Sequence, residues 1–163
     1  DITGNTVASP SLAENLLVVG SSAPDQTMAL SRKGEGDGSA KVVWVAEDAS
    51  SSFGSPLVAG NWLYLVNRAG VATCHDLKDG SKKWNLRLPA SCWASPLSSS
   101  GRIYFFTKDG VTVVLKGDGT NVALAQNKLS IAGTVYGVAS VDEAFVLRTG
   151  SELICIGLEG SNP

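Results

Sequence analysis

A repeat of about 40 residues constrains the fold of this chain more than any other feature. Small residues near the start of each unit, Ser9, Ser55, Ser95 and Gly137, follow one another at steps of 46, 40 and 42 residues. A second column, nine residues further on, holds Val18, Tyr64, Tyr104 and Val146. Two columns kept in register through four units indicate four copies of one supersecondary unit.

The stretch from Ser52 to Trp84 shows what one unit contains. Residues 54–58, 62–66, 71–77 and 83–86 are short β-prone runs separated by turn sequences, the clearest being Lys78-Asp79-Gly80. The runs are apolar at successive positions instead of alternating, so both faces of each sheet need cover. Blades packed face to face around an axis supply that cover. We therefore predict an all-β fold, a β-propeller of about four antiparallel four-stranded blades.

The expected boundaries place one domain over residues 1–163, with blades at about 7–48, 53–88, 93–127 and 135–157. The fourth unit supplies only three strands before the chain ends. Because propellers of this kind close with four to eight blades, four units predict an open arc, or half of an eight-bladed ring. The rest of a longer propeller chain or a second copy would then complete the ring. The start at Asp1 without methionine indicates a processed chain or a fragment.

Charge and hydropathy exclude several classes of partner. The formal net charge of −2 gives no basic surface for nucleic acid. No apolar run reaches the 18 residues that a membrane span needs. Three cysteines without CxxC spacing, Cys74, Cys92 and Cys155, favour buried free thiols over a disulfide framework.

One segment carries a family resemblance. Residues 74–84, CHDLKDGSKKW, resemble the A-x-D-A-x-T-G-x-x-x-W repeat of pyrroloquinoline-quinone (PQQ) type propellers. Asp76, Gly80 and Trp84 match the pattern, and Asp79 stands where the repeat has threonine. The ending at 148–157 is similar to the C-terminal half of exported bacterial PQQ-like repeat proteins. The resemblance implies structural roles for these three residues and for Trp44, which lies 40 residues before Trp84. It also implies an exported protein of the periplasm or cell envelope.

The same resemblance raises the question of a quinone cofactor. Quinoprotein dehydrogenases of this superfold hold PQQ with a disulfide between adjacent cysteines, a coplanar tryptophan and a Glu/Asn/Asp set around calcium. No two cysteines are adjacent in this chain. We therefore expect no cofactor and no catalytic residues, and a protein that is not an enzyme.

Other polar residues give weaker signals for chemistry. His75 is the only histidine and replaces a hydrophobic strand residue, which favours a packed side chain over a metal ligand or general base. The segment 35–38 (EGDG) has too few oxygen ligands for a calcium loop and is better read as a turn. Four basic residues around one hairpin favour a solvated outer edge: Lys78, Lys82, Lys83 and Arg87.

The candidate binding residues are aromatic. Two residues before the small column stand Val7, Phe53, Trp93 and Val135, with Tyr136 next to the last of them. Phe53, Trp93 and Tyr136 would lie near one mouth of the central channel, where aromatic side chains anchor ligands or peptides. The alternative is that they pack between blades. We predict a non-catalytic scaffold that binds protein or an envelope component; the other hypothesis is a degenerate segment of a PQQ-dependent quinoprotein oxidoreductase.

Overall fold

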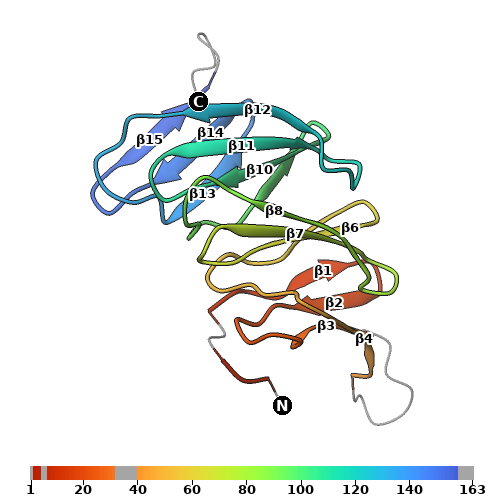
Figure 1. Ribbon diagram of the computed structural model, residues 1–163. Coiled ribbons are helices and arrows are strands. Elements are labelled where there is room, and N and C mark those ends of the chain that lie inside the picture. The colour runs from red at the N-terminus through yellow and green to blue at the C-terminus, as the bar shows by residue number, and fades with distance from the viewer. Residues whose placement is uncertain (1, 5–6, 32–39, 158–163) are drawn as a thin grey trace.

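The chain folds into four antiparallel sheets stacked side by side, with no helix among the described residues (Figure 1). The computed structural model describes residues 2–4, 7–31 and 40–157. The segment 35–38, which we expected to be a turn, lies outside them. The sheets follow the repeat units in order, and we call them blades 1 to 4.

Each blade is an up-and-down sheet whose strands run outward from the axis in chain order. Blade 1 contains β1 (Ser11–Ala13), β2 (Leu16–Val19), β3 (Thr27–Ser31) and β4 (Val42–Ala46). Blade 2 contains β5 (Leu57–Ala59), β6 (Trp62–Val66), β7 (Val71–Asp76) and β8 (Lys82–Arg87). Blade 3 contains β9 (Leu97–Ser99), β10 (Arg102–Phe106), β11 (Val111–Lys116) and β12 (Ala123–Lys128). Blade 4 contains β13 (Gly137–Val141), β14 (Ala144–Arg148) and β15 (Leu153–Ile156).

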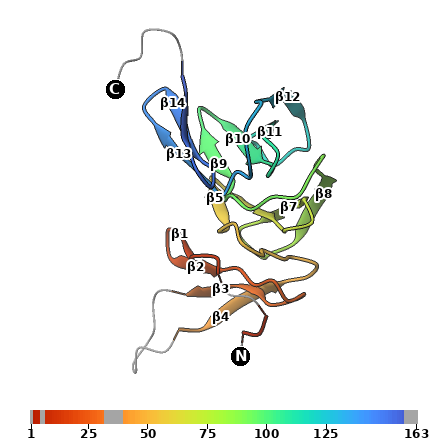
Figure 2. The ribbon, with the colours of Figure 1, turned by 90° about the vertical axis from the view of Figure 1, so that its left-hand side faces the viewer.

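The blades fan out as an arc that stays open between blade 1 and blade 4 (Figure 2). The inner strands β1, β5, β9 and β13 gather on the concave side, and neighbouring inner strands contact one another. The prediction of an all-β propeller of about four blades in an open arc is confirmed, as is the three-stranded fourth blade among the described residues.

The core consists of three separate clusters, one between each pair of successive blades. Val18, Ala29 and Trp44 of blade 1 pack against Leu63 and Leu65 of blade 2. Blades 2 and 3 bury a larger set that includes Tyr64, Cys74, Ile103, Phe105 and Leu115. Blades 3 and 4 share Phe106, Val135 and Leu147, with Tyr104 and Phe145 beside them. Strands such as β6 are therefore buried on both faces, which explains their unbroken apolar sequences.

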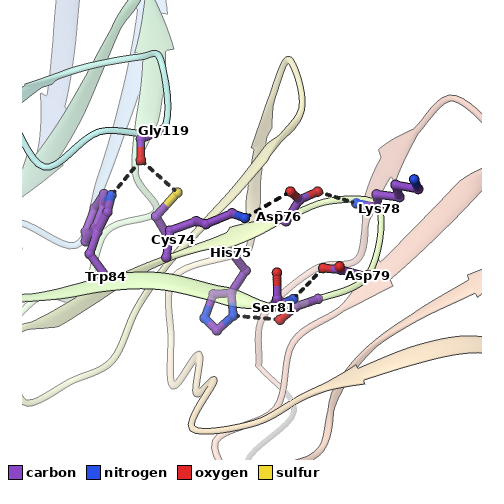
Figure 3. A network of polar contacts seen from close by, with 10 residues as sticks. Cys74, His75, Asp76, Lys78, Asp79, Ser81, Trp84 and Gly119 are labelled. Atoms are coloured by element: carbon purple, nitrogen blue, oxygen red, sulfur yellow. Dashed lines mark hydrogen bonds and ion pairs between the residues drawn. The ribbon is translucent and has the colours of Figure 1, made fainter.

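One tryptophan joins blade 1 to blade 2, and a second one joins blade 2 to blade 3 (Figure 3 shows the second). The indole Nε1–H of Trp44 donates to the Leu77 carbonyl at 2.9 Å, and that of Trp84 donates to the Gly119 carbonyl at 2.9 Å. Both carbonyls lie in the turn between the third and fourth strands of the following blade. We call each of these contacts a tryptophan latch.

The turns that receive the indoles require glycine. Gly80 has φ +76°, and a Cβ there would lie 2.8 Å from Cε3 of Trp44. In the next blade, Gly119 has φ +81°, and a Cβ would lie 2.3 Å from Cε2 of Trp62. A side chain at either position would meet both backbone strain and a ring. Asp76 closes the first turn by accepting from the Lys78 N–H at 3.0 Å and pairing with Lys83 at 3.2 Å.

The small residues of the repeat form a ladder along the inner strands. The Ser9 N–H donates to Ser55 Oγ at 3.0 Å, and the Ser55 N–H donates to Ser95 Oγ at 2.8 Å. At Gly54, a Cβ would lie 2.9 Å from the Ala94 carbonyl oxygen, so successive blade starts are in close contact. The small column therefore reflects how tightly the inner strands converge.

The outer strand of blade 3 differs from the expectation. The sequence predicted a strand at residues 121–125 with Leu124 equivalent to Trp84, but β12 begins at Ala123 and ends at Lys128. In blade 2, Trp84 pairs with Cys74 across neighbouring strands. In blade 3, Ala125 pairs with the equivalent residue Val114 and so holds the position of Trp84. Both blades have a bulge at this place, Cys74/His75 and Val114/Leu115, so the offset comes from the longer turn before β12, residues 117–122 against 77–81 before β8.

Across the described residues, the structure contains no helix of the length and hydropathy needed to cross a membrane.

Candidate functional site: an aromatic cluster at the start of the inner strands

The three aromatic residues singled out from the sequence lie together in the structure. Phe53 and Trp93 stack with ring centroids 4.6 Å apart and an interplanar angle of 14°. Trp93 meets Tyr136 edge to face, with centroids 5.6 Å apart and planes at 90°. We call these three residues the aromatic cluster; it spans the starts of blades 2, 3 and 4.

The repeat itself brings these rings together. Phe53 and Trp93 each stand two residues before a serine of the ladder, and the hydrogen bond from Ser55 to Ser95 fixes those serines side by side. Tyr136 is held by its N–H, which donates to the Arg148 carbonyl at 2.9 Å. Residues placed at one position of successive blades thus become neighbours in space, although 40 residues separate them in sequence.

The burial pattern leaves one side of the cluster open. Phe53 is half-buried, whereas Trp93 is 38 % exposed and Tyr136 is 41 % exposed. Val135, the residue in the predicted column, is fully buried between blades 3 and 4, so Tyr136 supplies the ring in blade 4. Val7 of blade 1 is 60 % exposed and carries no ring.

A cation that sequence reasoning missed adjoins the cluster. The Arg148 guanidinium lies 6.0 Å from the centroid of the Tyr136 ring, within cation–π range. Arg148 pairs with Gly137 across the β13–β14 hairpin. Arg148 and Gly137 lie equally far in sequence from the Asp142-Glu143 turn, and this symmetry is the sequence signal that could have located Arg148. The cluster therefore offers stacked ring faces, ring edges and one positive charge.

The aromatic cluster offers ring surface for binding and contains no ionisable carboxylate, thiol or imidazole of its own. Within the described ranges, no group of three or more His, Cys, Asp or Glu residues is placed to hold a metal ion. Cys74 and Cys92 are buried free thiols, as the sequence predicted, whereas that prediction is wrong for Cys155, which is free but exposed on β15.

His75 lies in the core between blades, away from the aromatic cluster. It is fully buried, with Nδ1 3.0 Å from the Gly80 carbonyl oxygen and Nε2 3.1 Å from Thr73 Oγ1. Burial lowers the pKa of His75 below its ordinary value of 6.5. The imidazole is therefore neutral and occupied on both nitrogens, as a packed side chain is.

The basic residues at the β7–β8 hairpin are partly neutralised by carboxylates. Lys82 pairs with Asp48 at 2.7 Å and Lys83 with Asp76 at 3.2 Å, while Lys78 and Arg87 are exposed. The Lys82 ammonium holds the pKa of Asp48 below its usual range. The hairpin is thus an exposed edge with paired charges rather than a concentrated basic patch.

Comparison with solved structures places this geometry among PQQ-type propellers. BamB from Moraxella catarrhalis is similar with a TM-score of 0.74 and 14% identity, over 91% of this chain and 41% of that one. The computationally designed Ika4 protein is similar with a TM-score of 0.74 and 12% identity, over 97% of this chain and 96% of that one. The quinohemoprotein alcohol dehydrogenase ADHIIG from Pseudomonas putida HK5 follows with a TM-score of 0.70 and 12% identity, over 90% and 28%.

These likenesses show the fold, and a family model shows the family. The chain spans less than half the length of the BamB structure that it matches. No curated protein sequence matches it significantly. The model described as outer membrane protein assembly factor BamB, built on the PQQ repeat, matches residues 36–156, which is more than half of the 163 residues. The chain therefore belongs to the BamB-like family of PQQ-repeat β-propellers.

Proposed function

We propose that this protein is a non-catalytic propeller that binds polypeptide segments in the bacterial cell envelope. The observation that carries the proposal is the aromatic cluster, in which three successive blades bring Phe53, Trp93 and Tyr136 into one contiguous surface. The description of the family, an outer membrane protein assembly factor, supports an exported protein with protein partners.

The chemistry of the cluster favours an extended peptide with apolar or aromatic side chains. Tryptophan and tyrosine rings offer a large contact area at a low cost in conformational entropy, and they are frequent hot spots of interfaces. Arg148 beside Tyr136 adds a donor for a backbone carbonyl or a carboxylate of the bound segment. A strand of an outer-membrane protein, which alternates apolar and polar residues, has these features.

Peptide titration tests the proposal directly. The probe is a dye-labelled synthetic peptide with alternating aromatic and polar residues, and its fluorescence anisotropy is followed as protein is added. We expect Trp93→Ala to weaken binding about tenfold or more and Trp93→Phe to retain most of it. Val7→Ala is the matched control, because Val7 holds the same repeat position in blade 1 but lies outside the aromatic cluster. Equal affinities of Trp93→Ala and the parent protein would overturn the proposal.

The same preparation distinguishes a degenerate quinoprotein segment. Addition of PQQ with calcium should leave the intrinsic tryptophan fluorescence unchanged if the protein is a scaffold. Saturable quenching at micromolar quinone would favour the oxidoreductase hypothesis instead.

We also propose that the 163-residue chain on its own completes its arc with a second copy. Blade 1 turns an entirely apolar face away from blade 2, and we call it the outer face of blade 1. Its two cross-strand rows are Leu12, Leu17, Leu30 and Val42, and Val19, Met28 and Val45. The equivalent side chains of blade 2, Val58, Leu63 and Leu65, pack against blade 1.

Blade 4 presents the complementary face at the other end of the arc. Ala139, Val146 and Cys155 form a cross-strand row there. Val146 holds the repeat position at which Val18 and Tyr64 pack onto the next blade. Since every internal interface joins these two kinds of face, blade 4 of one copy fits the outer face of blade 1 of another, and two such contacts give a closed pair.

Light scattering after size exclusion tests this pairing. We expect a mass near twice 16.8 kDa, and a monomer for Val45→Lys. Val122→Lys serves as the control, because Val122 is similarly exposed but lies just before β12, outside both faces. Cys155 adds a second readout, because burial raises the pKa of Cys74 and Cys92 to about 12 and leaves Cys155 as the exposed thiol. A monomer that binds no hydrophobic dye and whose Cys155 reacts freely would overturn the pairing.

A further inference from the structure

A second concave site lies between blades 1 and 2, away from the aromatic cluster. It is a cleft of about 590 Å³ bounded by the β1–β2, β5–β6 and β7–β8 turns. We call it the blade 1–2 cleft. The residues of the aromatic cluster come directly before the inner strands. The β1–β2 and β5–β6 turns come directly after inner strands, and the β7–β8 turn is hydrogen-bonded to the β5–β6 turn through Leu77 and Asn61. The two sites therefore occupy opposite ends of the blades.

The cleft exists because one large side chain of the repeat is missing from blade 1. Leu16 opens β2 and pairs with Ala13, as Trp62 opens β6 and pairs with Ala59. In the crevice between blades 2 and 3, the Trp62 indole packs so closely on the β11–β12 turn that a Cβ at Gly119 would lie 2.3 Å from it. Leu16, at the equivalent position of blade 1, is smaller than Trp62 and lines the cleft between blades 1 and 2, while the glycine of the β7–β8 turn, Gly80, is covered by Trp44.

The walls of the cleft match an aromatic group. Leu16, Val58 and Leu77 form an apolar floor, and they also pack against the core between blades 1 and 2. Asn15 and Asn61 also line the cleft, and because both residues are exposed we take them as its rim. Pockets with an apolar floor and a few polar groups at the rim hold an apolar group and fix its orientation through the rim.

Three charged residues of mixed sign line the cleft, Glu14, Asp76 and Lys78. Asp76 pairs with Lys83 at 3.2 Å and accepts the Lys78 N–H at 3.0 Å. Lys83 in turn lies 5.8 Å from the Trp62 ring centroid. The Lys78 ammonium is exposed beside the opening. The cleft therefore has no concentrated charge that would select a small ion, and its selectivity rests on shape and apolar surface.

We propose that the blade 1–2 cleft binds an aromatic side chain of a partner polypeptide, with the ring occupying the place that Trp62 fills in the next crevice. The backbone flanking that side chain lies at the rim, within reach of the Asn15 and Asn61 amides. The site is independent of the aromatic cluster, so the partner is captured at a point that the proposed function does not use.

Substitution at Leu16 tests the proposal because it fills the cleft from within. The probes are N-acetyl-tryptophanamide and the peptide Gly-Trp-Gly, with N-acetyl-leucinamide as the aliphatic control. Chemical-shift changes are followed in ¹⁵N-labelled protein. In the parent we expect saturable shifts at Leu16, Val58 and the Asn61 side-chain amide, with the aliphatic control about tenfold weaker. In Leu16→Trp we expect binding at least tenfold weaker and a higher Tm.

Matched variants separate this site from the other one. Val122→Trp adds the same ring at an exposed position outside the cleft and outside both end faces, and should leave the cleft binding unchanged. Trp93→Ala should also leave it unchanged, whereas it removes peptide binding at the aromatic cluster. If Leu16→Trp does not fold, the map of shifts in the parent decides by itself. Shifts centred on the aromatic cluster, absence of saturable shifts, or equal binding by a folded Leu16→Trp would each overturn the proposal.

Discussion

The interface between blades 2 and 3 is closed along its whole depth, whereas the one between blades 3 and 4 is closed only near the axis. Between blades 2 and 3, the Trp84 latch reaches Gly119 at the outer edge, and eleven buried residues fill the space inside it. Between blades 3 and 4, every residue of β12 is exposed, and Val122 and Leu124 are about half exposed. The buried residues there are Ala94, Phe106, Val135 and Leu147, and the rings of Tyr104 and Phe145 pack beside them.

The difference begins with a missing indole in the outer strand of blade 3. At the place of Trp84, blade 3 has Ala125. The aromatic contacts of Tyr104 and Phe145, with centroids 4.8 Å apart, compensate close to the axis. Outer and inner contacts between blades are therefore separable features of this fold.

The largest effect is expected from removal of the Trp84 latch. Trp84→Ala removes a half-buried indole and its hydrogen bond, and should lower the free energy of unfolding by about 3 kcal/mol in urea titrations. Leu124→Ala, in the corresponding region of blade 3, should change it little because that side chain is about half exposed and holds no latch. Similar losses in the two variants would show that the outer edges of the two interfaces do not differ.

The receiving turn gives the next largest effect. Gly119→Ala places a Cβ against Trp62 at a φ of +81° and should cost about 2 kcal/mol in thermal or urea unfolding. Gly101→Ala separates strain from collision, because Gly101 has φ +70° with no atom within 4 Å of its added Cβ. Its cost should be about 1 kcal/mol. Equal costs would mean that the close packing of Trp62 contributes nothing.

The serine ladder should give a smaller loss near the axis. Ser95→Ala leaves the part-buried Ser55 N–H without its acceptor and should cost about 1 kcal/mol. The equivalent change at the end of the ladder, Ser9→Ala, alters an exposed residue that donates through its backbone, so stability should hardly move. The pair is compared by urea unfolding, and a larger loss at Ser9 would contradict the role of the ladder.

The smallest effect appears only at acid pH and concerns a position where the blades differ. His75 of blade 2 stands where blades 3 and 4 have Leu115 and Ile156. Burial lowers its pKa in the folded state, so the unfolded chain takes up the proton first as the pH falls through 6.5. The contribution of neutral His75 to the free energy of unfolding should therefore be fully present above pH 6.5 and should decrease as the pH falls below it.

His75→Leu supplies the test of that decline. The variant should show a flatter dependence of Tm on pH between pH 7.5 and 5 than the parent. His75→Gln, which keeps hydrogen-bonding capacity without titrating in this range, is the control for lost polar contacts. A parent and a His75→Leu variant with parallel pH profiles would rule out the buried imidazole as the source of the decline.

The sequence predicted the blades well because the repeat columns correspond to real contacts. The small column became the serine ladder, and the second column placed Val18, Tyr64 and Tyr104 facing the next blade. It failed at β12, since the turn before this strand, residues 117–122, is longer than its equivalent in blade 2, residues 77–81, and shifts the register by one residue. Periodicity counts residues along the chain and does not see such insertions within a hairpin.

The candidate site was predicted in its composition more than in its geometry. The aromatic residues could be found from their repeat positions, but the contact of Tyr136 with Arg148 depends on the register of a hairpin. The blade 1–2 cleft is harder still, because it results from a side chain that is smaller than its repeat equivalent. Leu16 looks like an ordinary strand residue until Trp62 is seen packed on Gly119.

The direction of the latches has a consequence for synthesis on the ribosome. Trp44 and Trp84 find their acceptors 33 and 35 residues further along the chain, always toward the C-terminus. A newly made blade therefore has its indole but not the carbonyl that will receive it until most of the following blade has left the exit tunnel. At about 5–20 residues per second, that interval lasts a few seconds, during which an indole stays exposed at the growing end of the arc.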